Sequence, residues 1–177
     1  MENIKYKIEF YSNWHCGSGL SAGADVDSLV IKDTDGLPFI PGRTLKGLLR
    51  DAATQLYGEN DKIKNMFGVS DDEKEPDFSG CFFKDAKLSE NERDYIIQNN
   101  LSDYLYQTFA STAIENGIAK PASLRKIETV VPCVLEGEIL DIPDEEHIKI
   151  LNKAMMFIKR IGTGRNRGYG RCDIRKE

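Results

Sequence analysis

Two stretches of the chain have helical periodicity, and short apolar runs lie between and around them. In residues 43–58, apolar side chains recur every three or four residues, which predicts an amphipathic helix with a single apolar face. Residues 144–162 predict a second helix. Its acidic residues come first, and Lys159 and Arg160 come last, as the helix dipole favours.

Runs rich in β-branched and aromatic residues predict strands at 4–14, 81–88, 130–140 and 168–175. Two shorter runs, 28–31 and 37–40, flank an Asp-Gly turn and predict a hairpin. The resulting order contains a β-α-β-β-α-β unit. We therefore predict an α+β fold with a ferredoxin-like (RRM-like) core and an antiparallel sheet.

The chain of 177 residues is longer than such a core needs, and we expect it to form a single domain over 1–177. We assign the surplus to a glycine-rich loop at 15–25, an acidic loop over 69–78 and an insertion over 107–131. Long irregular segments in a compact domain are uncommon unless they are functional. The insertion has little apolar periodicity, so we expect it to be extended and exposed.

Charge is segregated along the chain, whose net charge is −5. Residues 71–77 carry five acids and one lysine, whereas residues 160–177 carry six basic and two acidic residues. An acidic total therefore does not exclude binding of nucleic acid to a basic surface. No stretch is apolar enough to span a membrane, and the four cysteines form no CxxC pair. We expect a cytoplasmic protein with reduced thiols, no membrane contact and no supported zinc site.

The most unusual stretch is the tract 160–172, "RIGTGRNRGYGRC", which holds four glycines and four arginines. Arginine forks onto phosphate, glycine allows close approach of a backbone, and tyrosine can stack on a base. The tract predicts an anion-binding loop. Its candidate residues are Gly162, Gly164, Arg165, Arg167, Gly168 and Tyr169.

The first helix carries a basic stripe of Arg43, Lys46 and Arg50. Positive side chains in a first turn oppose the helix dipole unless an anion offsets both, which suggests a phosphate at the helix start. A helix with solvated basic residues is the alternative.

Two further side chains could carry chemistry. Asp27 ends the glycine-rich loop and could position a divalent ion or a hydroxyl group. His15 lies beside that loop and could act as a general base or donate to a phosphate. His147 begins the second helix, and we expect it at the surface.

Together these segments resemble the CRISPR-associated RAMP superfamily, and in particular the repeated backbone subunit of type III effector complexes. The resemblance runs in order through "HCGSGL", "VDSLVIKDTDGLPFIPGRTLKGLLRDA", "MFG", "GCFFKDAKL", "ENGIAKPASLRKIETV" and "GTGRNRGYGRC". The "PFIPGRTLKGLLR" block and the terminal glycine-rich loop are its most specific parts. These two segments lie near opposite ends of one domain, so a chance match of both is rarer than a chance match of either alone.

The resemblance implies a ferredoxin-like core with a lid, and copies of the chain that stack into a filament around a CRISPR RNA. The insertion over 107–131 would be a thumb that interrupts pairing between guide and target RNA. Asp27 matches a family aspartate at the target's scissile phosphate, with Mg or Mn assisting cleavage in the assembled complex. The residues implied to contact RNA are His15, Arg43, Lys46, Arg50, Gly162, Gly164, Arg165, Arg167, Gly168 and Tyr169.

Three alternatives stay open on the sequence. The chain is short for a backbone subunit, and Arg43-Thr44 replaces the small serines common in the family. It could therefore be a non-cleaving structural or capping subunit of the same complex. It could also be a metal-independent endoribonuclease that processes CRISPR RNA through His15. A ferredoxin-like small-molecule sensor is the alternative from outside nucleic-acid biology.

Overall fold

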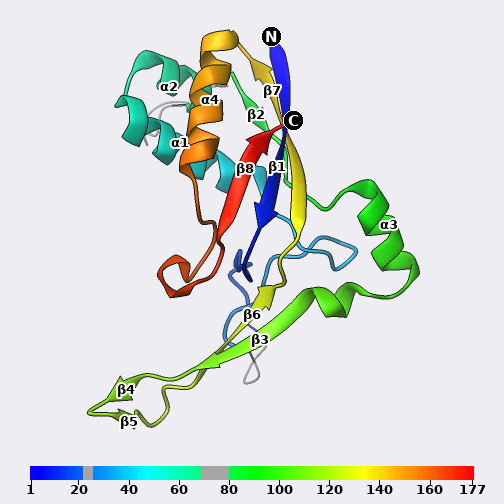
Figure 1. Ribbon diagram of the computed structural model, residues 1–177, viewed down its shortest axis with the longest axis vertical. Helices are drawn as coiled ribbons and strands as arrows, with labels where there is room; N and C mark the ends of the chain where they lie inside the picture. Colours follow the sequence, from blue (N-terminus) through cyan, green and yellow to red (C-terminus); the bar gives the residue numbers. More distant parts are fainter. Residues whose placement is uncertain (22–25, 69–79) are drawn as a thin grey trace.

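The computed structural model describes residues 1–21, 26–68 and 80–177, and its main body is one sheet covered on one face by helices (Figure 1). The sheet contains β1 (Glu2–Phe10), β2 (Phe82–Phe83), β7 (Val134–Ile142) and β8 (Cys172–Lys176). Its spatial order is β2-β7-β1-β8, and every neighbouring pair is antiparallel. The helices α1 (Gly42–Tyr57) and α4 (Glu145–Phe157) pack against each other and against the sheet.

Alternation along β1 explains why only one face is covered. Ile4, Tyr6, Ile8 and Phe10 are buried under the helices, whereas the residues between them face the other side. Burial of each such large apolar side chain contributes about 1.5–3 kcal/mol. The open face is instead covered by ion pairs, among them Lys7 with Glu136 and Glu177 and Lys84 with Glu138.

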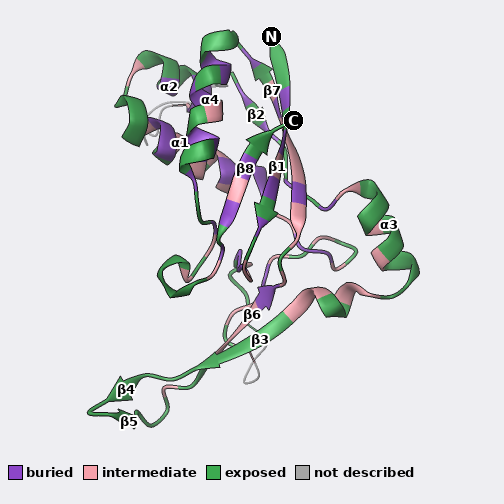
Figure 2. Ribbon diagram, in the orientation of Figure 1, coloured by how far each residue is buried: buried purple, intermediate pink, exposed green. Residues whose placement is uncertain are grey.

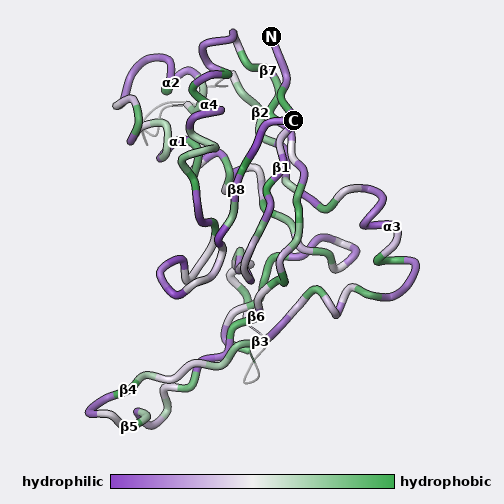
Figure 3. Tube along the Cα trace, viewed as in Figure 1, coloured by the Kyte–Doolittle hydropathy of each residue, from purple (hydrophilic) through white to green (hydrophobic). Residues whose placement is uncertain are grey.

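A long arm leaves the lower end of the main body in Figure 1. It consists of β3 (Tyr106–Ser111) paired with β6 (Arg125–Val130), and its tip holds β4 (Ile114–Glu115) and β5 (Ile118–Ala119). Figure 2 shows that the arm is exposed along most of its length. Its tip nevertheless carries hydrophobic positions (Figure 3), with Ile114 and Ile118 both more than two-thirds exposed. The insertion predicted over 107–131 is thus a regular antiparallel hairpin.

Two helices lie outside the pair that periodicity predicts. The helix α2 (Asp61–Phe67) is short, capped by the Asn60 side chain, and buries Ile63, Met66 and Phe67. Its seven residues are too few for a clear apolar stripe, so periodicity did not predict it. The helix α3 (Glu90–Gln98) starts with a capping box formed by Ser89 and Glu92 and buries none of its own residues. A short 3₁₀ turn, η1 (Ser102–Leu105), connects α3 to the arm.

Several predicted strands are shorter than the sequence patterns suggested. Residues 28–31 and 37–40 form isolated bridges, such as that between Lys32 and Pro38, rather than a regular hairpin. Within 81–88 only Phe82 and Phe83 form a strand. The strand predicted over 130–140 is divided, because Pro132 has no N–H to donate and separates β6 from β7.

His147 is buried, so the prediction that it lies at the surface is wrong. Its Nδ1 is 2.8 Å from Asp144 Oδ1, and the same carboxylate caps the start of α4 by accepting from the His147 backbone N–H. The four cysteines are free thiols, with Cys16, Cys81 and Cys172 buried and Cys133 partly buried. The predicted acidic loop over 69–78 lies outside the described residues. None of the helices in the described ranges is long and apolar enough to cross a membrane.

The link between α3 and the body gives a pH prediction. Burial raises the pKa of Asp33, but hydrogen bonds from Arg93 and from the backbone amides of Leu37 and Asp35 outweigh it and lower that pKa. A lowered folded-state pKa stabilises the fold above the unfolded-state value of about 4, and this stabilisation is lost as pH falls through the folded-state pKa. In Asp33→Asn, the free energy of unfolding should be lower at pH 7 and fall less steeply below about pH 4. Denaturant titrations at several pH values measure this, and Asp103→Asn, at an exposed carboxylate, should behave like wild type.

Candidate nucleic-acid interface

Three segments far apart in the sequence meet at one end of the sheet because of the strand register. Phe10, the last residue of β1, pairs with Cys172 at the start of β8, and Glu9 pairs with Val134 at the start of β7. The loop after β1, the glycine-rich tract before β8 and the base of the arm before β7 therefore leave the sheet together, as Figure 1 shows.

The glycine-rich tract folds back on the loop after β1. The Thr163 N–H donates to the His15 carbonyl at 2.9 Å, and the Gly170 N–H donates to the Asn13 carbonyl at 2.8 Å. A Cβ at Gly162 would collide with the His15 carbonyl, and a Cβ at Gly170 would collide with the Ile161 carbonyl. These two glycines make room for the protein's own backbone, whereas the sequence suggested that the tract's glycines allow a ligand to approach.

The centre of the tract is a short 3₁₀ turn, η2 (Arg165–Arg167), flanked by Gly164 and Gly168 in the left-handed conformation. This geometry turns the chain tightly and leaves the side chains of Arg165 and Arg167 exposed. The Arg165 carbonyl accepts a hydrogen bond of 2.7 Å from the Arg160 side chain, which connects the turn to the segment that follows α4. Two guanidinium groups on a braced turn are well suited to contact phosphates.

Tyr169 packs against the arm rather than projecting into solvent. Its ring meets the Phe109 ring of β3 edge-on, with 5.7 Å between the centroids. The Asn13 side chain makes a second link to the arm by donating to Gln107 on β3 at 3.0 Å and to Thr129 on β6 at 3.2 Å. The tract, the loop and the arm are therefore in direct contact.

The basic stripe of α1 lies on a different side of the helix from the tract. The hollow between α1 and the tract is lined on the helix by Leu48, Asp51 and Gln55, and on the tract by Arg165 and Asn166. Successive helical residues are rotated by about 100°, so Arg43, Lys46 and Arg50 face away from that hollow. The structure does not bring these two basic elements together.

The start of α1 already has an anionic partner. The Gly42 N–H donates to the Asp85 carboxylate at 2.8 Å. This side chain offsets the helix dipole and the nearby basic residues, so the conflict that suggested a bound phosphate has a solution within the protein.

Asp27 is exposed beside the arm, next to Lys126 near the start of β6. Its Oδ2 accepts from the Lys126 N–H at 2.7 Å, and its own N–H donates to the Lys126 carbonyl at 2.9 Å. These two bonds fix the carboxylate beside β6 and leave Oδ1 without a partner within the described residues. No group of three or more His, Cys, Asp or Glu side chains in residues 1–21, 26–68 and 80–177 could hold a metal ion.

His15 is buried, in contrast to the exposed position that a general base or phosphate donor requires. Its Nδ1 lies 2.6 Å from the Glu128 carbonyl oxygen, and its Nε2 lies 3.1 Å from the Ser28 hydroxyl. Both ring nitrogens therefore have partners within the protein, so the imidazole has a structural role here.

A cluster of side chains around Glu128 connects the loop after β1 to the arm. No sequence pattern indicated this cluster. The Glu128 carboxylate accepts from the Val30 N–H at 3.0 Å and from Lys32 Nζ at 2.9 Å. Lys32 also lies over the Tyr106 ring, 3.7 Å from its centroid, and the Tyr106 hydroxyl donates to the Gly36 carbonyl at 2.6 Å. Burial raises the pKa of Tyr106, so it stays a protonated donor. In the sequence, the only indication of this role was that Glu128 lies close to the apolar residues of a predicted strand.

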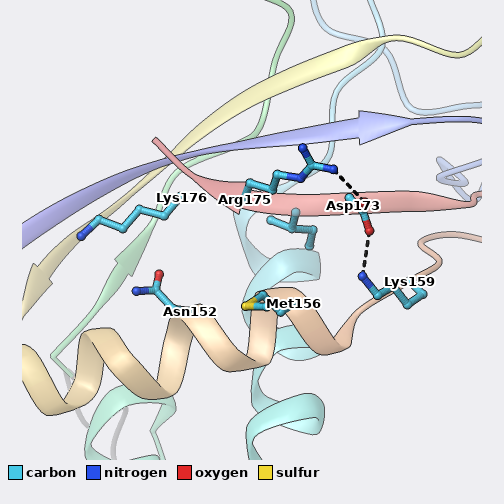
Figure 4. A pocket seen from close by; sticks show the side chains of 7 residues that line it. Asn152, Met156, Lys159, Asp173, Arg175 and Lys176 are labelled. Atoms are coloured by element: carbon cyan, nitrogen blue, oxygen red, sulfur yellow. Dashed lines mark hydrogen bonds and ion pairs between the residues drawn. The ribbon is translucent and has the colours of Figure 1, made fainter.

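A second hollow lies between α4 and β8, on another part of the surface (Figure 4). Its charged groups neutralise one another: Asp173 accepts from Lys159 at 2.8 Å and from Arg175 at 3.0 Å. These two hydrogen bonds lower the pKa of Asp173. The hollow therefore has less capacity to attract an anion than its lysines and arginine suggest.

Residues 7–173 match the family model of the RAMP superfamily. The chain belongs to the RAMP superfamily. This confirms the family that the sequence motifs indicated.

Two relatives of this RAMP chain carry the name "CRISPR system Cms endoribonuclease Csm3". The one from Streptococcus thermophilus is 27% identical, and the alignment covers 96% of this chain and 88% of the relative. The one from Mycobacterium tuberculosis (strain ATCC 25618 / H37Rv) is 30% identical, with 66% of this chain and 52% of the relative covered.

Solved structures share the fold of the RAMP chain. A chain from the "Type III-B Cmr-beta bound to cognate target RNA" superposes with a TM-score of 0.77 at 13% identity, covering 99% of this chain and 97% of the other. A chain from the apo state of the same complex gives 0.72 at 14% identity, with 98% and 96% covered. The predicted α+β class with antiparallel pairing is confirmed.

The glycine-rich tract gives a stability prediction with a matched control. Gly168 and Gly170 both have positive φ, at 90° and 70°, but only Gly170 faces backbone where a Cβ would stand. Gly168→Ala should cost about 1 kcal/mol for the left-handed conformation. Gly170→Ala adds an overpacked contact and should cost about 2 kcal/mol more. Denaturant unfolding of both variants measures the difference, and equal losses would contradict the packing role of Gly170.

Proposed function

We propose that this RAMP chain is a CRISPR RNA-binding backbone subunit of a type III effector complex, and that it cleaves target RNA at Asp27. The names of the two relatives and the RNA-bound complex with the same fold support this proposal. The observation that carries it is the exposed Asp27 carboxylate, which accepts from the Lys126 N–H near the start of β6 while the Asp27 backbone N–H donates to the Lys126 carbonyl. Its partners would be CRISPR RNA, target RNA, further copies of the chain and other subunits, in the cytoplasm.

We also infer that the sheet and its two packed helices form the ferredoxin-like unit. In chain order the four sheet strands are β1, β2, β7 and β8, with α1 after the first and α4 after the third. Their spatial order is second, third, first, fourth, with all neighbours antiparallel. That arrangement agrees with a β-α-β-β-α-β unit, and the arm is then an insertion between its second and third strands.

Guide RNA would bind through its phosphates, because pairing rather than the protein supplies sequence specificity. The exposed Arg165 and Arg167 on the braced turn form one contact region. Arg43, Lys46 and Arg50 on the other side of α1 form a second one. A polyanion that follows the surface can contact both regions, so they do not need to share a pocket.

The proposed cleavage is an internal transesterification of the target strand. The 2′-oxygen forms a bond to the adjacent phosphorus while the bond from phosphorus to the next 5′-oxygen breaks. The 2′-hydroxyl loses its proton and the 5′-oxygen gains one, which yields a 2′,3′-cyclic phosphate and a 5′-hydroxyl. Asp27 Oδ1 would accept a hydrogen bond from the 2′-hydroxyl and orient it toward the phosphorus.

Asp27 could help to bind a divalent ion only if RNA and water supplied most of the ion's ligands. Mg²⁺ is commonly held by one or two carboxylates together with substrate phosphates and water. An Mg or Mn ion would neutralise charge that develops on the phosphate. The role of the protein is then to present Oδ1, which the Lys126 bond to Oδ2 keeps oriented.

A non-cleaving structural subunit is the second candidate, and one observation favours it. Asp27 already has a structural task, since its carboxylate accepts a hydrogen bond from the Lys126 N–H near the start of β6. The third reading, a metal-independent endoribonuclease that uses His15, has less support because both nitrogens of the buried His15 ring are occupied.

The first functional prediction separates these candidates at Asp27. In Asp27→Asn, the amide oxygen can still accept from the Lys126 N–H, but the negative charge is lost. Cleavage of target RNA by the assembled complex with magnesium should fall by at least about 100-fold, while guide binding stays unchanged. Asp103→Asn, at another exposed carboxylate, is the control. Cleavage by Asp27→Asn at the wild-type rate would refute the catalytic role and leave the structural candidate.

The second functional prediction concerns the arginines of the tract. Arg165→Ala/Arg167→Ala should weaken binding of guide RNA and reduce the slope of log affinity against log salt by about 1 for each lost phosphate contact. Lys149→Ala/Lys153→Ala removes the same charge from exposed positions on α4 and should leave the slope near its wild-type value. Filter binding or gel shifts at several salt concentrations measure both. Equal slopes for the two double variants would contradict a specific phosphate contact at the tract.

A further inference from the structure

We propose that His15 is the positioning residue that fixes Asp27 relative to the glycine-rich tract, through the hydroxyl of Ser28. This inference rests on the proposed cleavage at Asp27. It assigns the imidazole to alignment of the site rather than to proton transfer or contact with RNA.

The hydrogen bonds of His15 determine its tautomer. A backbone carbonyl only accepts, so the 2.6 Å contact with the Glu128 oxygen requires the proton on Nδ1. In the neutral ring Nε2 is then an acceptor, and the Ser28 hydroxyl at 3.1 Å is its donor. Ser28 follows Asp27 directly in the chain. The imidazole thus bridges the arm strand β6 and the residue next to the proposed catalytic carboxylate.

The backbone of the same residue holds the tract. The His15 carbonyl accepts from the Thr163 N–H at 2.9 Å, and Gly162 approaches it so closely that a side chain there would collide. His15 therefore contacts the phosphate-binding tract through its main chain, and the arm and the Asp27 loop through its ring. A shift of this residue would change the distance between the two halves of the proposed site.

The main chain beside Asp27 is paired with β6 over a few residues only. Ser28 forms an isolated bridge to Ile127, and its carbonyl accepts from the Glu128 N–H at 3.0 Å, while the Asp27 side chain is exposed. The ring of His15 is buried, and Gly17 leaves space for it, since a Cβ there would be 3.1 Å from Nε2. The partly buried bond from Ser28 to His15 on one side and the paired bonds of Asp27 to Lys126 on the other restrict the carboxylate.

The decisive variant is Ser28→Ala, because it removes only the hydroxyl that His15 accepts from. Single-turnover cleavage by the assembled complex, at saturating target RNA, should slow by about tenfold, because small misplacements of a catalytic group reduce rate strongly. The affinity for guide RNA should stay within about twofold, since the tract is held by the His15 backbone. Hydrogen exchange at the Lys126 amide, which donates to Asp27, should become faster in the same complex.

Ser18→Ala is the matched control. Its hydroxyl donates to the Leu29 carbonyl at 3.1 Å, so it stabilises the same loop without contacting His15. It should leave the cleavage rate and the Lys126 exchange near wild type. Equal losses in Ser18→Ala and Ser28→Ala would show general loosening of the loop and overturn the proposal.

Two His15 variants test whether the ring acts on Asp27 through its contact with Ser28. His15→Gln can place an amide near the former Nε2 and keep a contact with Ser28, whereas His15→Asn can donate only to the Glu128 carbonyl. The glutamine variant should therefore retain more cleavage than the asparagine variant. The opposite order would contradict positioning through Ser28.

Asp27→Asn separates this inference from the function on which it rests. If Asp27→Asn abolishes cleavage but Ser28→Ala matches wild type in both rate and Lys126 exchange, the positioning role of His15 is refuted and the proposed function stands. If Asp27→Asn cleaves normally, the proposed function fails, and the Lys126 exchange in Ser28→Ala still decides whether His15 holds this loop.

Discussion

The antiparallel register of β1 with its two neighbours is the constraint on which the rest of this structure depends. The end of β1 lies opposite the starts of both β7 and β8, so the segments that precede those two strands leave the sheet beside the loop that follows β1. Each of these segments by itself either has little regular secondary structure or is exposed to solvent. At their meeting point the loop after β1 hydrogen-bonds both to the glycine-rich tract and to the arm, and Tyr169 of the tract packs against Phe109 of the arm. A one-residue slip would also place the apolar face of β1 in solvent, so burial of the core and assembly of the site fix the same register.

Buried polar groups at this meeting point determine which side chains stay available for a ligand. His15 and Glu128 are taken up by contacts within the protein, with the Glu128 side chain 13% exposed. Such groups are costly to bury unless their hydrogen bonds are satisfied, so they specify one arrangement of the loop on the arm. The groups left at the surface are Asp27, Arg165 and Arg167. This division gives the proposed RNA site a rigid interior and an exposed set of charges.

The acidic total charge is compatible with a polyanionic partner because the charges are arranged locally. On the open face of the sheet and in the hollow beside β8, lysines and arginines pair with nearby carboxylates. The Asp85 carboxylate likewise accepts from the Gly42 N–H at the start of α1, so a bound phosphate is not needed there. The arginines of η2 are held by backbone contacts of their turn, which leaves their guanidinium groups exposed. Position and pairing therefore matter more than net charge.

The sequence by itself determined the elements that depend on neighbouring residues. The apolar stripe of α1, the alternation of β1, the exposed character of the arm and the motifs of the RAMP superfamily are local patterns, and each was predicted from them. The tertiary structure alone decided the burial of His15, the role of Glu128 and the anionic partner of α1. His15 and Glu128 are 113 residues apart, and Gly42 and Asp85 are 43 apart. No local periodicity encodes such contacts, because they form only when the sheet register brings distant segments together.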